Sequence, residues 1–280
     1  MRDTLATRRT AELLRNLTMR EVKGRYKRTA LGNLWSLINP LATMATYTLV
    51  FGVFMRVQID PSPTGLDVFA LWLMCGLIPW TFFSTAVSTG LTSVVANANL
   101  VKKVFFRREV LVASSVFALD VTTMVEFGVL ILALLLFGQM VLPWIPVVLV
   151  LLALLTALAL GLGLMLAVAN VYFRDTQHFV AILFQIWFYA TPIIYPMRLV
   201  EEAQVKLDAR LAEWDLSFPL VQLWELNPLL HFVNAFRAVL YEESWPSWGD
   251  WAWCVGSAAV VLLVGWRVFQ KFEPRLAEEL

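Results

Sequence analysis

REVKGRYKRTALGNLWSLINPL, residues 20–41, is the point where a basic segment passes into a long apolar one. Its first nine residues contain five cations: Arg20, Lys23, Arg25, Lys27 and Arg28. Trp35 follows, and the apolar block behind it reaches Val57. Cations, an interfacial aromatic residue and then about 20 apolar residues are typical of a chain that enters a bilayer from the cytoplasm. The stretch predicts an integral membrane protein whose N-terminus lies inside the cell.

The composition excludes an ordinary water-soluble fold. The 280 residues are 59% hydrophobic and 15% charged, with a mean hydropathy of +0.70, whereas soluble domains carry about 25% charged residues. Cys75 and Cys254 both lie in apolar surroundings and neither belongs to a CxxC pair, which disfavours zinc, redox and disulfide roles. The first 33 residues hold nine basic residues and no apolar core, so we expect no cleaved signal peptide.

Six apolar blocks predict an all-α membrane protein with six transmembrane helices. The blocks are residues 36–57, 67–96, 110–138, 145–169, 178–196 and 250–270. This divides the chain into an N-terminal cytoplasmic or interfacial helix (1–33), a transmembrane domain (34–270) and a short cytoplasmic tail (271–280).

The distribution of positive charge predicts the orientation. Seventeen of the 22 Lys and Arg residues lie in 1–33, in the 97–109 loop, at Arg174 or after residue 266. The short segments 58–66 and 139–144 contain none, and segment 197–249 has four basic residues against nine acidic ones if Asp250 is included. Because Lys and Arg accumulate in cytoplasmic loops, we expect both termini in the cytoplasm of a bacterium and segment 197–249 outside.

Two segments outside the six blocks carry structural signals. Leu13, Leu14 and Leu17 recur at helical spacing before the first block, which predicts an amphipathic helix in the membrane interface; a solvated helix that packs on a partner fits equally well. Segment 197–249 is rich in Trp and Phe but is broken by Pro219 and Asn227-Pro228. We expect it to dip into the outer leaflet as a re-entrant element, part of an outer gate.

Motifs for covalent chemistry are missing from the sequence. It has no G-x-x-x-x-G-K-[ST] loop, and Gly161 and Gly163 inside an apolar block predict close helix packing instead. His178 and His231 stand apart from any His/Cys/Asp cluster, so each is interpreted as a local hydrogen-bonding residue. We therefore expect no catalytic residue, metal site or cofactor site in this chain.

Polar and aromatic residues within the blocks are candidates for the wall of a pore. Asp120 and Glu126 lie deep in the third block, where a charge normally faces protein or water; pairing with a neighbouring helix explains them as well as a water-filled path does. Tyr47, Phe51 and Phe54 follow i, i+4, i+7 spacing, which predicts one aromatic helix face.

The fifth block adds Trp187 and Tyr189 to these candidates. Aromatic faces stack on the C–H faces of sugars, which suits a glycan channel, but packing against lipid or core accounts for the same aromatic residues.

Six sequence blocks, in order, resemble a known family. They are RYKRTALGNLWSLINPL (25–41), GLIPWTFFSTAV (76–87), NANLVKKVFFRREVL (97–111), NVYFRDTQHF (170–179), ATPIIYP (190–196) and NPLLHFVNAFR (227–237). Together they resemble the permease subunit of ABC-2 type polysaccharide exporters, the Wzm-like O-antigen, teichoic-acid and galactan transporters.

The resemblance implies a homodimeric channel in the inner membrane, driven by two copies of a separate cytoplasmic ATPase that binds ATP and Mg²⁺. It implies an ATPase-coupling region formed by Lys102, Lys103, Phe105, Phe106, Arg107, Arg108, Arg174 and Asp175. It implies an outer gate that includes Pro192, Tyr195, Asn227 and Pro228. It implies that Arg25, Lys27, Arg28 and Trp35 lie where a lipid-linked polysaccharide enters the channel.

The coupling region also has a physical argument of its own. Cations bracket the apolar run Val104-Phe105-Phe106. An apolar knob ringed by cations suits docking into a cleft on a partly acidic partner; a basic cytoplasmic loop with interfacial aromatics fits the same pattern.

Two other functions compete with polysaccharide export at this point. A membrane-embedded glycosyltransferase or polymerase would need a catalytic carboxylate, and segment 197–249 offers acidic residues without a recognisable arrangement. A drug or lipid exporter would share the same permease fold. The glycan itself (O-antigen, capsule, teichoic acid or galactan) is left open by the sequence.

Overall fold

The computed structural model describes residues 2–25, 35–56, 59, 62–104, 106–211 and 218–280, and this part of the chain is helical without any strand. The longer helices in chain order are α1 (Arg2–Arg25), α2 (Trp35–Tyr47), α3 (Phe69–Ala96), α5 (Glu109–Leu136), α6 (Ile145–Tyr172), α7 (Thr176–Ala190), α8 (Arg198–Leu211), α10 (Pro228–Leu240) and α11 (Trp248–Phe272). The shorter ones are η2 (Thr48–Phe54), α4 (Ala98–Lys103), η3 (Leu142–Trp144), α9 (Leu220–Glu225), η5 (Glu273–Arg275) and α12 (Leu276–Glu279).

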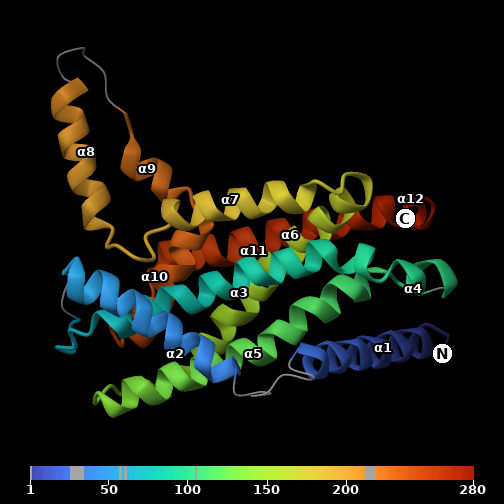
Figure 1. The fold of residues 1–280 in the computed structure, drawn as a ribbon, viewed down its shortest axis with the longest axis horizontal. Coiled ribbons are helices and arrows are strands. Elements are labelled where there is room, and N and C mark those ends of the chain that lie inside the picture. Colours follow the sequence, from blue (N-terminus) through green and yellow to red (C-terminus); the bar gives the residue numbers. More distant parts are fainter. Residues whose placement is uncertain (1, 26–34, 57–58, 60–61, 105, 212–217) are drawn as a thin grey trace.

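Most of the longer helices run lengthwise through one bundle, whereas α8 runs across the long axis at one end (Figure 1). Both termini, α4 and α12 lie at one end, which we name the terminal end, and α8, α9 and α10 lie at the other, the α10 end (Figure 1). In the best apolar stretch of α3, 78% of the residues are buried, against 28% in α5 and 22% in α11. Helix α3 is therefore the centre of the bundle, and α5 and α11 present apolar faces outward.

Four helices are long and apolar enough to cross a membrane: Phe69–Ala96, Glu109–Leu136, Leu142–Tyr172 and Trp248–Arg275. They correspond to the second, third, fourth and sixth predicted blocks. The first block forms α2 followed by the π-helical η2, a shorter apolar element. The fifth block ends its helix at Ala190, six residues earlier than predicted. Four of the six predicted blocks therefore form candidate membrane-spanning helices, and the count of six spans stays a prediction.

Pro192 explains the early end of α7. Proline has no N–H to donate, and its ring pushes the residue before it out of the helical region. Thr191 accordingly has extended backbone, with φ −106° and ψ 128°. The 15 residues of α7 span about 22 Å, short of the ~30 Å hydrocarbon core of a bilayer. The non-helical residues 191–196 that follow it belong to the site described below.

Glycines set two close helix crossings, as predicted for Gly161 and Gly163. A Cβ at Gly161 would lie 2.5 Å from the backbone of Val261, so α6 and α11 touch backbone to backbone there. A Cβ at Gly90 would lie 3.4 Å from the Cα of Gly163, where α3 crosses α6. Small residues permit such close approach of helices, so α6 is held between α3 and α11.

Helices α1 and α10 complete the bundle at its two ends. Leu17 is buried, with Leu13 and Leu14 beside it, in an apolar cluster shared with α5 and α6, so the leucine face of α1 packs on protein. The predicted outer segment 197–249 forms α8, α9 and α10. Helix α10 packs against α3, α6 and α11, and ten of its 13 residues are buried.

Candidate functional site

Two of the four residues that the sequence places at a substrate entrance lie outside the described residues. Lys27 and Arg28 belong to the undescribed segment 26–34, and Arg25 is described only as the last residue of α1. Trp35, the first residue of α2, is exposed. The entrance role of these residues stays a prediction.

The helix that carries the predicted aromatic face differs from the prediction at Phe54. Tyr47 and Phe51 stack with ring centroids 5.9 Å apart and pack against the core. Phe54 is 73% exposed. Residues 48–54 form a π-helix, whose hydrogen bonds run from i to i+5, so a residue at i+7 turns away from the face it would share in an α-helix. Tyr47 and Phe51 therefore form a pair without Phe54.

Asp120 contacts the neighbouring helix. The Thr156 hydroxyl of α6 donates to Asp120 Oδ1 at 2.7 Å and also to the carbonyl of Leu152. Glu126, further along α5, is half-buried. The sequence left two explanations for Asp120, a pore-lining role and pairing with a neighbouring helix. The hydrogen bond from Thr156 is a pairing of the second kind.

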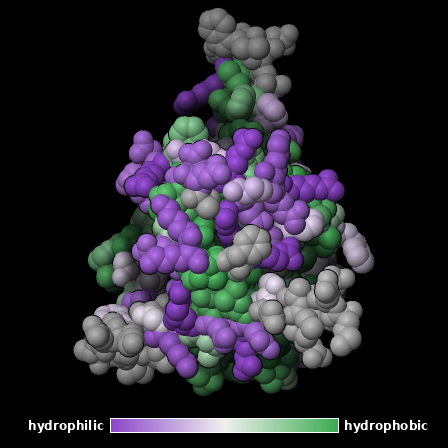
Figure 2. Space-filling model, turned by 90° about the vertical axis from the view of Figure 1, so that its right-hand side faces the viewer, coloured by the Kyte–Doolittle hydropathy of each residue, from purple (hydrophilic) through white to green (hydrophobic). Residues whose placement is uncertain are grey.

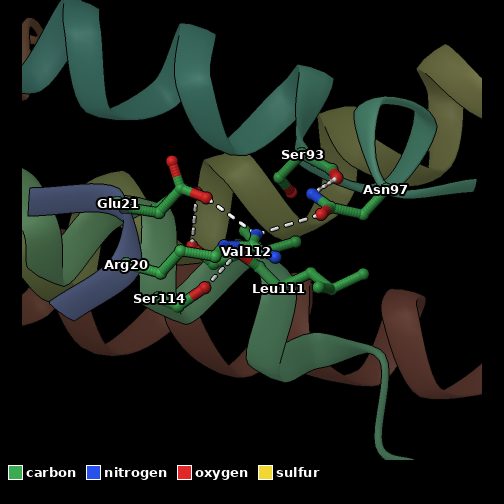
Figure 3. Close-up of polar contacts among 8 residues, drawn as sticks. Arg20, Glu21, Ser93, Asn97, Leu111, Val112 and Ser114 are labelled. Carbon is green, nitrogen blue, oxygen red and sulfur yellow. Dashed lines mark hydrogen bonds and ion pairs between the residues drawn. The ribbon is translucent and has the colours of Figure 1, made fainter. Parts of the chain in front are cut away.

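A polar contact anchors α1 to the terminal end of the bundle (Figure 3). Arg20, which the sequence showed only as one cation of a basic run, donates to Asn97 Oδ1 at 3.1 Å and pairs with Glu21 at 2.9 Å. Asn97 lies between α3 and α4, and its amide donates to the carbonyl of Ser93. The position of α1 is therefore coupled to the base of α4.

The 97–109 loop lies at the terminal end, and only part of its predicted apolar knob is exposed. Lys102 and Lys103 are exposed and Val104 is 51% exposed, whereas Phe106 packs against the apolar cluster that contains Leu17. Phe105 lies outside the described residues. Because burying an aromatic ring removes a large apolar area from water, Phe106 stabilises the loop from within instead of protruding.

The two arginines of this loop have partners within the chain. Arg107 pairs with Glu109 at 2.6 Å. The backbone N–H of Arg108 donates to Glu273 Oε1 at 2.8 Å and its guanidinium donates to the carbonyl of Glu273. The two Arg108 contacts join the loop to Glu273, the residue that follows α11. The loop is therefore braced by the C-terminal segment.

The turn between α6 and α7 adds an exposed aromatic to the same end. Phe173 is 73% exposed, and Arg174 and Asp175 beside it are exposed. Figure 2 looks onto this end and shows hydrophilic side chains gathered around a hydrophobic area. The terminal end thus presents exposed apolar side chains among cations.

Trp187 belongs to an aromatic cluster between α3 and α7. It makes edge contacts with Trp80 and Phe83, at centroid distances of 6.2 and 5.6 Å, and packs against the core. Tyr189 on the same helix is exposed. The two aromatics predicted together as pore residues therefore lie in different surroundings.

Asn227 connects three elements at the α10 end. Its Oδ1 accepts from Trp187 Nε1 at 2.9 Å and from the backbone N–H of Leu229, which caps α10. Its amide donates to Thr191 Oγ1 at 2.8 Å. Pro228 follows at the first position of α10, where a missing N–H costs no hydrogen bond. The residue pair Asn227-Pro228 thus starts α10 and ties it to the end of α7.

The non-helical residues 191–196, which we name the 191–196 segment, lie beside Asn227. Pro192 is buried within it. The Tyr195 hydroxyl donates to the carbonyl of Tyr189 at 2.7 Å and accepts from Trp224 Nε1 at 3.4 Å. The structure therefore brings all four residues predicted for an outer gate, from positions 192 to 228, into one region.

Arg237 is a residue of this region that sequence reasoning missed as a site. It is buried, and its guanidinium donates to the carbonyls of Pro192 and Ile193. A charged residue in the last turn of a mostly apolar helix was the signal available for finding it.

His231 links α10 to α9 and α11. Its Nδ1 lies 2.8 Å from Asp250 Oδ1, its Nε2 lies 2.8 Å from the carbonyl of Glu225, and its ring stacks on Trp253. Both neighbours of the ring nitrogens are acceptors, so the protonated imidazolium satisfies both contacts. Burial lowers the pKa of His231, but the hydrogen bonds to Asp250 and Glu225 and the charges of those residues outweigh it and raise the pKa above 6.5. The predicted local hydrogen-bonding role is confirmed.

This contact makes the stability of the α10 end depend on pH. When folding raises the pKa of a group, that group stabilises the fold fully at any pH below its unfolded pKa, here 6.5. This stabilisation is lost as the pH rises through the folded pKa. We expect the melting temperature of the purified protein to fall by a few degrees as pH rises above neutrality. His231→Gln should flatten this dependence, measured by a fluorescence melt; an unchanged slope in that variant would assign the dependence to other groups.

Comparisons with known proteins agree over nearly the whole chain. The sequence profile of ABC-2 type transporters matches residues 12–205. The chain is 33% identical over 273 residues to the O-antigen export system permease protein RfbA of Myxococcus xanthus, covering 95% of this chain and 93% of the relative. It is 29% identical to the protein of the same name from Klebsiella pneumoniae, covering 96% and 95% of the two chains.

A more distant relative is the polysialic acid transport protein KpsM of Escherichia coli, 27% identical over 79% of this chain and 78% of its own. The family profile covers the chain from within α1 to within α8, and the O-antigen relatives match 95% or more of the chain. With its apolar helical bundle and this similarity, the chain belongs to the ABC-2 type transporter family of membrane proteins.

Proposed function

We propose that this chain is the channel-forming permease subunit of an ATP-driven exporter that moves a lipid-linked polysaccharide across the bacterial inner membrane. The observation that carries this proposal is the similarity to O-antigen export permeases over 95% and more of the chain. The KpsM relative, a polysialic acid transport protein, supports a polysaccharide as the general substrate class.

The proposed arrangement has six membrane crossings, with both termini in the cytoplasm. The first crossing is α2 with η2, and the fifth is α7 together with the 191–196 segment, which extends the short helix. The terminal end faces the cytoplasm, supported by the concentration of Lys and Arg there. Helices α9 and α10 form a re-entrant element at the outer side, supported by the burial of α10 against α3, α6 and α11.

Two copies of this chain form the proposed channel, and two copies of a separate ATPase drive it. ATP and Mg²⁺ bind to the ATPase, and this chain binds neither. The coupling face at the terminal end consists of Lys102, Lys103, Val104, Phe173 and Arg174. Their exposure supports the proposal, because apolar anchors surrounded by charges are typical of protein interfaces.

The proposed outer gate is the region around the 191–196 segment and α10. Its support is the network in which Asn227 joins Trp187, Thr191 and the start of α10. A non-helical segment at the end of a membrane helix needs such partners, because lipid satisfies no backbone polar group.

Depletion of this protein tests the proposed function directly. We expect full-length lipid-linked polysaccharide to accumulate on the cytoplasmic side, because synthesis continues while export stops. The measurement is extraction of lipid-linked glycans after depletion, with analysis of their chain length and of the glycan at the cell surface. Restoration by the cloned gene is the control. Shortened chains in place of full-length ones would favour a polymerase and reject the export role.

A further inference from the structure

Arg237 is a deeply placed cation of the α10 end. Its side chain is 6% exposed. Nη1 donates to the carbonyl of Pro192 at 2.8 Å and Nη2 donates to the carbonyl of Ile193 at 2.7 Å. In the described part of the chain no carboxylate forms an ion pair with it. Two consecutive backbone carbonyls thus accept the hydrogen bonds of this guanidinium.

These carbonyls need donors because of how the chain runs there. The segment leaves the helical conformation at Thr191 and stays buried from Thr191 to Ile194. Buried backbone carbonyls without partners are costly. Arg237 supplies two parallel donors from a rigid plane, which a lysine ammonium lacks.

Helix α3 provides the other side of the Arg237 site. The guanidinium carbon lies 3.6 Å from the centre of the Trp72 ring, within the range of a cation–π contact. A Cβ at Gly76 would lie 3.1 Å from Nη2 and 3.0 Å from Val233, so the absence of a side chain there leaves room for the guanidinium. Three elements (α3, α10 and the 191–196 segment) therefore meet at this one group.

We propose that Arg237 is the positioning residue of the outer gate and holds the 191–196 segment against α3 and α10. The gate itself rests on the proposed function, whereas the attachment rests on the contacts above. Loss of both donors releases the middle of the segment, because the remaining contacts of Asn227 and Tyr195 hold only its two ends. Local opening of this kind leaves the core of the bundle intact.

The test measures thiol accessibility in the complete protein in membranes. Ile194, 7% exposed, is replaced by cysteine and labelled with a hydrophilic maleimide, with and without Arg237→Met. Ala159→Cys, at a fully buried site of α6, reports on general unfolding. The same proteins without the added cysteine give the background from Cys75 and Cys254, both buried.

We expect Arg237→Met to raise the labelling rate of the Ile194→Cys protein by about tenfold or more, while the Ala159→Cys protein stays protected throughout. Arg237→Lys should give a smaller increase, since lysine keeps the charge but not the paired donors. Unchanged protection of the thiol at position 194 in the presence of Arg237→Met would overturn the proposal. Parallel labelling of the thiol at position 159 would overturn it too, because it would mean that Arg237 supports the whole fold. Neither result depends on which substrate is exported, so a failure of the export assignment in the depletion experiment remains distinguishable.

Discussion

Alanine in place of Gly265 is expected to prevent stable folding of the permease. The new Cβ would lie 2.7 Å from the carbonyl carbon of Gly161 and 2.9 Å from its Cα. These are backbone atoms of a packed helix, so the clash is relieved only by moving α6 and α11 apart along their crossing. Added methyl groups in well-packed cores cost about 1–3 kcal/mol when side chains can adjust, and we expect a larger cost here because they cannot.

Gly256→Ala on the same helix is the matched control. A Cβ at Gly256 meets no atom within 4 Å, so this variant adds the same methyl group without the clash. The measurement is the yield of monodisperse protein after detergent extraction, together with its melting temperature. A Gly265→Ala protein that melts within a degree or two of Gly256→Ala would show that the helices adjust freely, contrary to the expectation.

Removal of the apolar anchors at the terminal end is expected to stop export while the permease still folds. In the double variant Val104→Ser, Phe173→Ser, both changed side chains are more than half exposed, so folding loses little. An ATPase docked on this face would lose its apolar contacts, and truncation of such anchors costs about 2 kcal/mol or more. We expect ATPase binding to weaken by more than tenfold and surface glycan to disappear.

Val205→Ser, at an exposed site of α8, is the control for lowering surface hydrophobicity at the opposite end of the bundle (Figure 1). The measurement is the amount of ATPase that co-purifies with the tagged permease, normalised to permease in the membrane, together with surface glycan. Undiminished ATPase binding by the double variant would place the coupling face elsewhere.

The apolar helices were predictable because hydropathy is a property of consecutive residues. Four of the six blocks reappear as long apolar helices with similar bounds, and the interpretation of Gly161 and Gly163 as packing residues is confirmed. The end of α7 was less predictable. Pro192 interrupts its hydrogen bonding within a stretch that remains apolar, and a hydropathy pattern does not register that change.

Individual site residues were harder to predict than the helices. Phe54 leaves the face of Tyr47 because a π-helical turn changes the angular period, and no residue type in the sequence announces that turn. Phe106 packs inward against a cluster of buried side chains that includes Leu17 of α1 and Leu276 of α12. Such outcomes depend on partners far away in the chain.

The sequence by itself determined that this chain is a membrane protein, that it resembles ABC-2 permeases, and which segments carry its charges and apolar helices. Only the tertiary structure decided which polar groups meet: Arg20 with Asn97, His231 with Asp250, and Arg237 with the carbonyls of Pro192 and Ile193. The reason is physical. Transfer of a helix into lipid depends on its own residues, whereas a buried polar group is stabilised by the partners that folding brings within hydrogen-bond distance.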